Sequence, residues 1–233
     1  NTGIGLAMNA AAKGYRAILV MPDNMTRERI NLLRAYGAEV VLTKAEERMP
    51  GAIRKAQELH RKIPRSFIPQ QFQNPANPDI HRKTTALEIL QQTSGRLDAF
   101  VASSGTGGTI TGTGEALKEH LPDLEIYVVE PKGSPVLSGG KPGPHKLVGT
   151  SPGFIPDILN TEIYNEIVQV EDDNALKTVR DLARREGILV GMSAGATVWA
   201  SLMLARKLGK GKRILCIAPD TGERYLSMDV FSQ

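Results

Sequence analysis

Short apolar runs alternate along this chain with longer amphipathic runs, and this alternation limits the possible folds more than any other feature. Short, nearly continuous apolar runs are typical of strands buried on both faces, and amphipathic spacing indicates helices. The predicted strands are Arg16–Pro22, Ala38–Thr43, Asp98–Ser103, Glu125–Glu130 and Arg213–Pro219. The predicted helices are Gly3–Lys13, Thr26–Tyr36, Pro50–Lys62, Pro78–Gln92, Thr109–His120, Asp173–Glu186 and Gly195–Leu208. The pattern predicts an α/β fold with mostly parallel sheets between two layers of helices.

The composition narrows the class of protein. The chain has 233 residues, 41% of them hydrophobic, which is enough for one large domain or two small ones. No apolar run approaches the ~20 residues that cross a bilayer. The net charge is +4, but basic residues are interspersed with acids and aromatics make up 5%, unlike a nucleic-acid-binding surface. The single cysteine, Cys216, permits no internal disulfide, which suits a reducing cytoplasm. From the cysteine, the charge pattern and the apolar runs together, we expect a cytoplasmic protein without nucleic-acid or membrane partners.

The stretch VASSGTGGTITGTGEAL, from Val101 to Leu117, places a glycine-rich turn between a predicted strand and a predicted helix. Amide groups of such a turn point into one concavity, and the helix dipole makes it positive, so an anion such as phosphate is favoured. The dinucleotide pattern G-x-G-x-x-G fails at Ile110, and the P-loop pattern is absent. The turn therefore predicts a phosphate site without a nucleotide signature, with a plain strand-to-helix turn as the alternative.

Several longer motifs occur in a characteristic order along nearly the whole chain. They are NTGIGLA, QQFQNPANPDIHRKTTALEI, SSGTGGTITG, GPHKLVGTSPGFIP, GMSAGA and PDTGERYLS. Together they resemble the cysteine synthases, or O-acetylserine sulfhydrylases, which have the tryptophan synthase β-subunit-like fold of pyridoxal-phosphate enzymes. The resemblance implies a transferase with pyridoxal 5′-phosphate as cofactor. In the intact protein, sulfide would replace the acetate of O-acetyl-L-serine to give L-cysteine.

The resemblance also implies roles for individual residues. The cofactor-binding set is Asn1, Gly105, Thr106, Gly107, Gly108, Thr109 and Ser193, and the substrate-binding set is Thr2, Gly3, Gln71 and Phe72. Within these sets, residues 105–109 would surround the phosphate, Asn1 would bond the 3′-oxygen, and Ser193 would face the pyridine nitrogen. On the residues alone, Ser193 fits the N-cap of the predicted helix from Gly195 better than it fits a cofactor contact. Gln71 and Phe72 also fit simple loop packing.

The family's Schiff-base lysine belongs upstream of the asparagine loop, whereas this chain starts at Asn1. No lysine present matches that motif, so we expect the lysine to precede residue 1 in the intact protein and no catalytic residue in the chain itself. His60, His81 and His120 lack metal-ligand spacing, and no metal is expected. Residues 1–75 are expected to complete a smaller, mobile lobe with the substrate loop, and residues 76–233 to form the larger lobe that binds the phosphate.

Two departures from the family pattern leave the sulfur nucleophile open. Asp220 and Thr221 stand where many relatives have two serines, and residues 149–151 replace a more usual Gly-Ile-Gly. The alternatives are a cystathionine β-synthase-like or serine/threonine dehydratase-like enzyme, an inactive binding module, and a nucleotide-binding Rossmann protein. As partners, the resemblance implies a second copy of the chain and the C-terminal tail of serine acetyltransferase.

Overall fold

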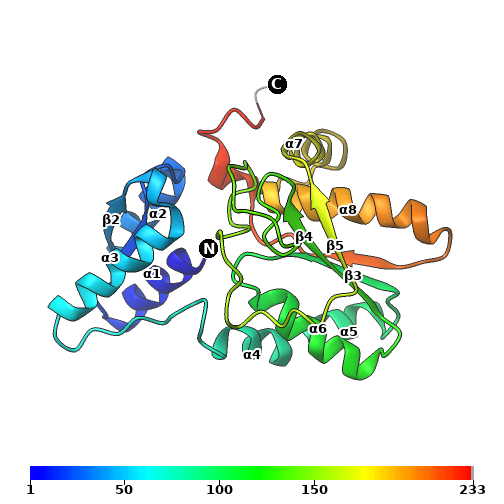
Figure 1. Ribbon diagram of the computed structural model, residues 1–233, viewed down its shortest axis with the longest axis horizontal. Coiled ribbons are helices and arrows are strands. Elements are labelled where there is room, and N and C mark those ends of the chain that lie inside the picture. The colour runs from blue at the N-terminus through cyan, green and yellow to red at the C-terminus, as the bar shows by residue number, and fades with distance from the viewer. Residues whose placement is uncertain (232–233) are drawn as a thin grey trace. The chain divides into compact units, whose positions relative to one another are not determined.

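The computed structural model describes residues 1–231, which form two compact units (Figure 1). The first unit comprises Asn1–Gln70 together with the C-terminal segment that starts at Gly222, and the second comprises Gln71–Thr221. No pattern in the sequence indicates that the C-terminal segment joins the first unit, because single long-range side-chain contacts hold it there. The expected mobility of the smaller lobe stays a prediction.

The first unit is built on a parallel pair of strands, with Ile18 opposite Glu39. Its strands are β1 (Ile18–Pro22) and β2 (Glu39–Thr43), and its helices are α1 (Thr2–Lys13), α2 (Arg27–Ala35), α3 (Arg48–Lys62) and the short η1 (Ala45–Glu47). Helix α2 begins after Thr26, whose hydroxyl accepts a hydrogen bond from the Arg29 amide at 3.4 Å. Helix α1 ends at Gly14, where φ is +71°. Both boundaries follow the capping signals in the sequence.

A buried arginine attaches the C-terminal segment to α2. Arg29 Nη2 donates a hydrogen bond of 2.5 Å to the Tyr225 hydroxyl, and the guanidinium carbon lies 5.0 Å from the centre of the tyrosine ring. Tyr225 is 1% exposed and lies in η3 (Gly222–Tyr225). Two residues later, Ser227 donates hydrogen bonds to the Glu28 carboxylate through its amide (2.5 Å) and its hydroxyl (2.6 Å).

Replacing Tyr225 with phenylalanine should lower the free energy of unfolding by about 1.5 kcal/mol. The substitution keeps the ring beneath the guanidinium but removes a buried hydrogen bond to a charged group. Urea unfolding followed by circular dichroism would measure the change. Tyr15→Phe is the matched control, because Tyr15 is 71% exposed; a loss of the same size in both variants would contradict the prediction.

The second unit is a four-stranded parallel sheet in the order β5-β4-β3-β6. The strands are β3 (Ala99–Ser103), β4 (Glu125–Pro131), β5 (Glu166–Val170) and β6 (Ile214–Cys216). Helices α4 (Ala76–Lys83), α5 (Thr85–Thr93) and α6 (Gly108–His120) cover one face, and α7 (Asp172–Asp181) and α8 (Met192–Leu208) cover the other (Figure 1). Ala99 in the central strand β3 pairs with both Glu125 and Ile214. The α/β fold with parallel sheets between helical layers is confirmed.

Three elements differ from the sequence prediction. The helix predicted over Pro78–Gln92 is two helices, because the chain turns at Thr84 (φ −127°, ψ −72°), whose amide and hydroxyl both bond to the Ile80 carbonyl. Asp79 lies inside α4, where its carboxylate pairs with Lys83. Strand β5 was not predicted, because an edge strand with the polar residues Glu166 and Gln169 lacks a continuous apolar run. The helix predicted from Asp173 ends in a π-helical turn, η2 (Leu182–Glu186).

Candidate cofactor site

The glycine-rich turn lies at the carboxyl end of the central strand β3. The strand ends at Ser103, α6 begins at Gly108, and Gly107 caps the helix with φ at +87°. The first amide groups of a helix have no carbonyl partner within that helix. Here the Thr111 amide is bonded to the Gly107 carbonyl at 3.0 Å and the Gly108 amide to the Thr106 hydroxyl at 3.3 Å. The amides of Thr109 and Ile110 lie between them in the first turn of the helix. This is the arrangement that binds anions in α/β proteins.

Packing against the protein explains why these positions are glycines. A Cβ atom on Gly105 would lie 2.3 Å from the Gly149 carbonyl oxygen, and one on Gly108 would lie 2.0 Å from Asn77 Oδ1. A Cβ atom on Gly107 would lie 2.7 Å from Leu159 Cβ. Glycines in such a turn also let an anion approach the backbone closely. The structure adds a second reason for glycine at these positions, because Asn77, Gly149 and Leu159 leave no room for a Cβ atom.

Ser193 supplies the clearest test of whether these residues suit pyridoxal phosphate. It is 4% exposed and lies in the first turn of α8, after Gly191. A hydroxyl at this position can donate its proton to a ligand nitrogen that accepts a hydrogen bond. The residues present therefore fit a pyridine ring with a phosphate group.

The predicted substrate residues of the second unit are held by two different elements. The Gln71 carbonyl accepts a hydrogen bond of 2.8 Å from Asn77 Nδ2 in α4. The Phe72 ring meets the Phe154 ring edge-on, with centroids 5.0 Å apart. The Phe72 carbonyl also accepts a hydrogen bond of 3.3 Å from the Ile158 amide. The segment that carries Gln71 and Phe72 is therefore fixed against α4 and against the long loop after β4.

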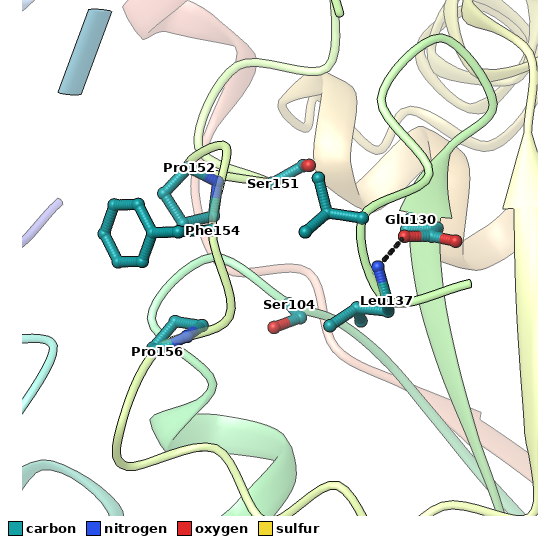
Figure 2. A pocket seen from close by; sticks show the side chains of 8 residues that line it. Ser104, Glu130, Leu137, Ser151, Pro152, Phe154 and Pro156 are labelled. Carbon is teal, nitrogen blue, oxygen red and sulfur yellow. Dashed lines mark hydrogen bonds between the residues drawn. The ribbon is translucent and has the colours of Figure 1, made fainter. Parts of the chain in front are cut away.

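The long loop between β4 and β5, residues 132–165, is held to the sheet and to the glycine-rich turn by hydrogen bonds. The Glu130 carboxylate, 1% exposed at the end of β4, accepts hydrogen bonds from the amides of Leu137 (2.8 Å) and Ser138 (3.2 Å). Figure 2 shows the Leu137 bond beside a small hollow lined by Ser104, Glu130, Val136, Leu137, Ser151, Pro152, Phe154 and Pro156. The Ser151 amide donates to the Ser104 carbonyl at 2.9 Å. The loop thus supports the glycine-rich turn from the side of Ser104.

The remaining predicted residues belong to the first unit. Asn1 precedes α1, and Thr2 and Gly3 are its first residues. The Asn1 side-chain oxygen accepts a hydrogen bond of 3.2 Å from Arg29 Nη1 and a further bond from Arg224. Guanidinium groups only donate, so they fix which end of the amide faces them. The Asn1 amide nitrogen therefore points away from the two guanidinium groups.

The sequence did not predict the side chains that hydrogen-bond to the predicted site residues. Asn77 contacts both Thr106 and Gln71, and Arg29 contacts Asn1. His81 Nε2 lies 3.3 Å from Thr109 Oγ1, and burial lowers the pKa of His81. No local pattern marks these residues, because each acts on a partner that is distant in the chain.

Neither a membrane-spanning helix nor a metal-binding group of side chains occurs among residues 1–231. None of the described helices combines the length and apolar character that a transmembrane span requires. Within the same residues, no group of three His, Cys, Asp or Glu side chains is arranged to hold a metal ion.

Comparison with known proteins decides the family. A family model described as pyridoxal-phosphate dependent enzyme matches residues 1–220. The chain belongs to this family. Within the pyridoxal-phosphate-dependent enzymes, a probable cysteine synthase of Bacillus subtilis is 66% identical over 235 residues, covering 100% of this chain and 76% of that protein. A cysteine synthase of Staphylococcus aureus is 54% identical over 233 residues, covering 100% of this chain and 75% of its own length.

The fold comparison agrees with the family. The crystal structure of a cysteine synthase from Entamoeba histolytica superposes with a TM-score of 0.94 at 41% identity. That match covers 100% of this chain and 69% of the Entamoeba chain. The pyridoxal-phosphate enzyme fold expected from the motifs is therefore confirmed.

Proposed function

We propose that the intact protein is a pyridoxal-phosphate-dependent cysteine synthase. It replaces the acetate of O-acetyl-L-serine with sulfide and releases L-cysteine. The observation that carries this proposal is the 66% identity to a probable cysteine synthase across the whole chain. The glycine-rich turn at Gly105–Thr109 and the buried Ser193 in the first turn of α8 support it as well.

The proposed roles follow from the donor chemistry of each residue. The amides of the turn and the hydroxyls of Thr106 and Thr109 hold the phosphate. Asn1 donates to the 3′-oxygen of the cofactor, Thr2, Gly3 and Gln71 bind the substrate carboxylate, and Phe72 lines the pocket. When bound, the cofactor supplies an electron sink for breaking bonds at the substrate α- and β-carbons.

Ser193 bears on which leaving group the site favours. Its hydroxyl donates a hydrogen bond to the ring nitrogen but cannot hold that nitrogen protonated, as a carboxylate would. The electron sink is therefore moderate, which suits elimination of a good leaving group such as acetate. This favours O-acetylserine over serine, whose hydroxyl leaves less readily, and so disfavours the dehydratase-like alternative.

Further parts of the proposal rest on the resemblance. The Schiff-base lysine precedes Asn1 in the intact protein, where it also moves the substrate α-proton. A second copy of the chain and the C-terminal tail of serine acetyltransferase are the proposed partners. The cytoplasm is the proposed location, supported by Cys216, which is free in the structure.

The test uses the purified full-length protein reconstituted with pyridoxal phosphate. We expect visible absorbance from bound cofactor, and cysteine formation from O-acetylserine and sulfide at least ~10-fold faster than from serine and sulfide. Release of a keto acid from serine would favour a dehydratase, and a product with homocysteine alone would favour a cystathionine β-synthase. A protein that takes up no pyridoxal phosphate would overturn the proposal.

A further inference from the structure

We infer that Asn77 is a positioning residue that couples the phosphate-binding turn to the substrate-binding segment at Gln71. The inference rests on the proposed function, because it assigns cofactor and substrate to those two segments. Asn77 itself contacts neither ligand. Its role is to set the orientation of groups that do.

Both N–H groups of the Asn77 side chain are used within the second unit. Nδ2 lies 2.8 Å from the Gln71 carbonyl oxygen and 3.0 Å from Thr106 Oγ1. A primary amide nitrogen has two protons, so this geometry gives one to each partner. One side chain therefore bridges two segments that lie 29 and 6 residues away from it in the chain.

The hydrogen bond from Asn77 also orients the hydroxyl proton of Thr106. Its oxygen accepts from Asn77 Nδ2 and also from the Gly108 amide at 3.3 Å. A hydroxyl has two acceptor lone pairs and a single proton. With both lone pairs occupied, the Thr106 proton is directed away from the protein donors and is available to an anion in the turn. Asn77 thus makes Thr106 a donor toward the phosphate.

Asn77 is held firmly enough to perform this role. It lies in the first turn of α4, and its amide bonds to the Asn74 carbonyl at 3.0 Å. Its Oδ1 atom occupies the space beside Gly108, where a Cβ atom would approach to 2.0 Å. The next residue, Pro78, packs its carbonyl against Gly112 of α6. The side chain therefore has little freedom to leave the two hydrogen bonds.

The substitution Asn77→Asp tests the bridge with almost no change of shape. An aspartate lacks both N–H donors, so it loses the bonds to Thr106 and Gln71 and adds a negative charge near the phosphate. We expect a rise of at least ~10-fold in the dissociation constant for pyridoxal phosphate, equivalent to about 1.4 kcal/mol. With the cofactor saturating, we expect the dissociation constant for L-methionine, an amino acid without a β-leaving group, to rise at least ~5-fold.

Two companion variants separate the two ends of the bridge. Thr106→Val removes the hydroxyl but keeps the bond to Gln71, so it should weaken cofactor binding and leave methionine binding within ~2-fold of wild type. Thr106→Ser should resemble wild type in both. Asn9→Asp controls for the added charge, since Asn9 is exposed on α1. Asn77→Ser serves if the aspartate variant does not fold.

The readouts do not depend on turnover. Fluorescence titration measures cofactor affinity, the visible absorbance change measures methionine affinity, and the ³¹P chemical shift of the bound phosphate reports the lost Thr106 bond. A folded Asn77→Asp or Asn77→Ser variant with wild-type values for both ligands would overturn the inference. So would a Thr106→Val variant that weakens methionine binding as much as Asn77→Asp does. Failure of the wild-type protein to take up pyridoxal phosphate would instead count against the proposed function.

Discussion

Alanine in place of Gly107 should raise the dissociation constant for pyridoxal phosphate at least ~100-fold. Gly107 has φ of +87°, and a Cβ atom there would lie 2.7 Å from Leu159 Cβ and 3.1 Å from Leu159 Cα. A side chain in the left-handed region costs about 1–2 kcal/mol, and forced overlap in a packed site costs about 1–3 kcal/mol more. The turn relieves both by changing shape, which turns its amide groups away from the phosphate.

Gly139→Ala is the matched control for this prediction. Gly139 has a similar φ of +81°, but no atom lies within 4 Å of its Cβ position. It should therefore show only the backbone cost and leave cofactor binding unchanged. Fluorescence titration with pyridoxal phosphate gives the dissociation constants, and far-ultraviolet circular dichroism verifies folding. Equal cofactor affinity in the two variants would mean that the shape of the turn does not hold the phosphate.

Alanine in place of Gly112 should lower the free energy of unfolding by about 2–3 kcal/mol. Gly112 lies inside α6, where alanine would normally stabilise a helix by about 1 kcal/mol. A Cβ atom at this position, however, would lie 1.8 Å from the Pro78 carbonyl oxygen. Backbone atoms cannot rotate away as a side chain can, so α4 and α6 must separate. The cost of that separation exceeds the gain in helix propensity.

The comparison variant for Gly112 is Gly5→Ala in α1. No atom lies within 4 Å of the Cβ position of Gly5, so the helix propensity acts alone. We expect stabilisation of up to about 1 kcal/mol in urea unfolding. Opposite signs for the two substitutions would establish the tight packing of α4 on α6. Stabilisation by both would contradict it.

Part of the candidate site was predictable from local sequence pattern, part only from the family resemblance, and part only from tertiary contacts. The anion-binding turn follows from local pattern, since strand, glycines and helix start are adjacent in the chain. The roles of Asn1, Gln71 and Ser193 were predictable only from the resemblance to a family, because residue type and spacing also fit structural roles such as a helix cap or loop packing. Asn77 came from neither, since its importance lies in hydrogen bonds to Gln71 and Thr106 that have no signature in the residues around it.

The sequence by itself determined the alternation of strands and helices, the cap at Thr26 and the glycine ends of helices such as α1. These features depend on hydrophobic period and on backbone preferences within a few residues. Only the tertiary structure decided the edge strand β5, the break at Thr84 and the return of the C-terminal segment to α2 through Arg29 and Tyr225. Those features depend on contacts between distant residues, whose energy appears only when the chain is folded.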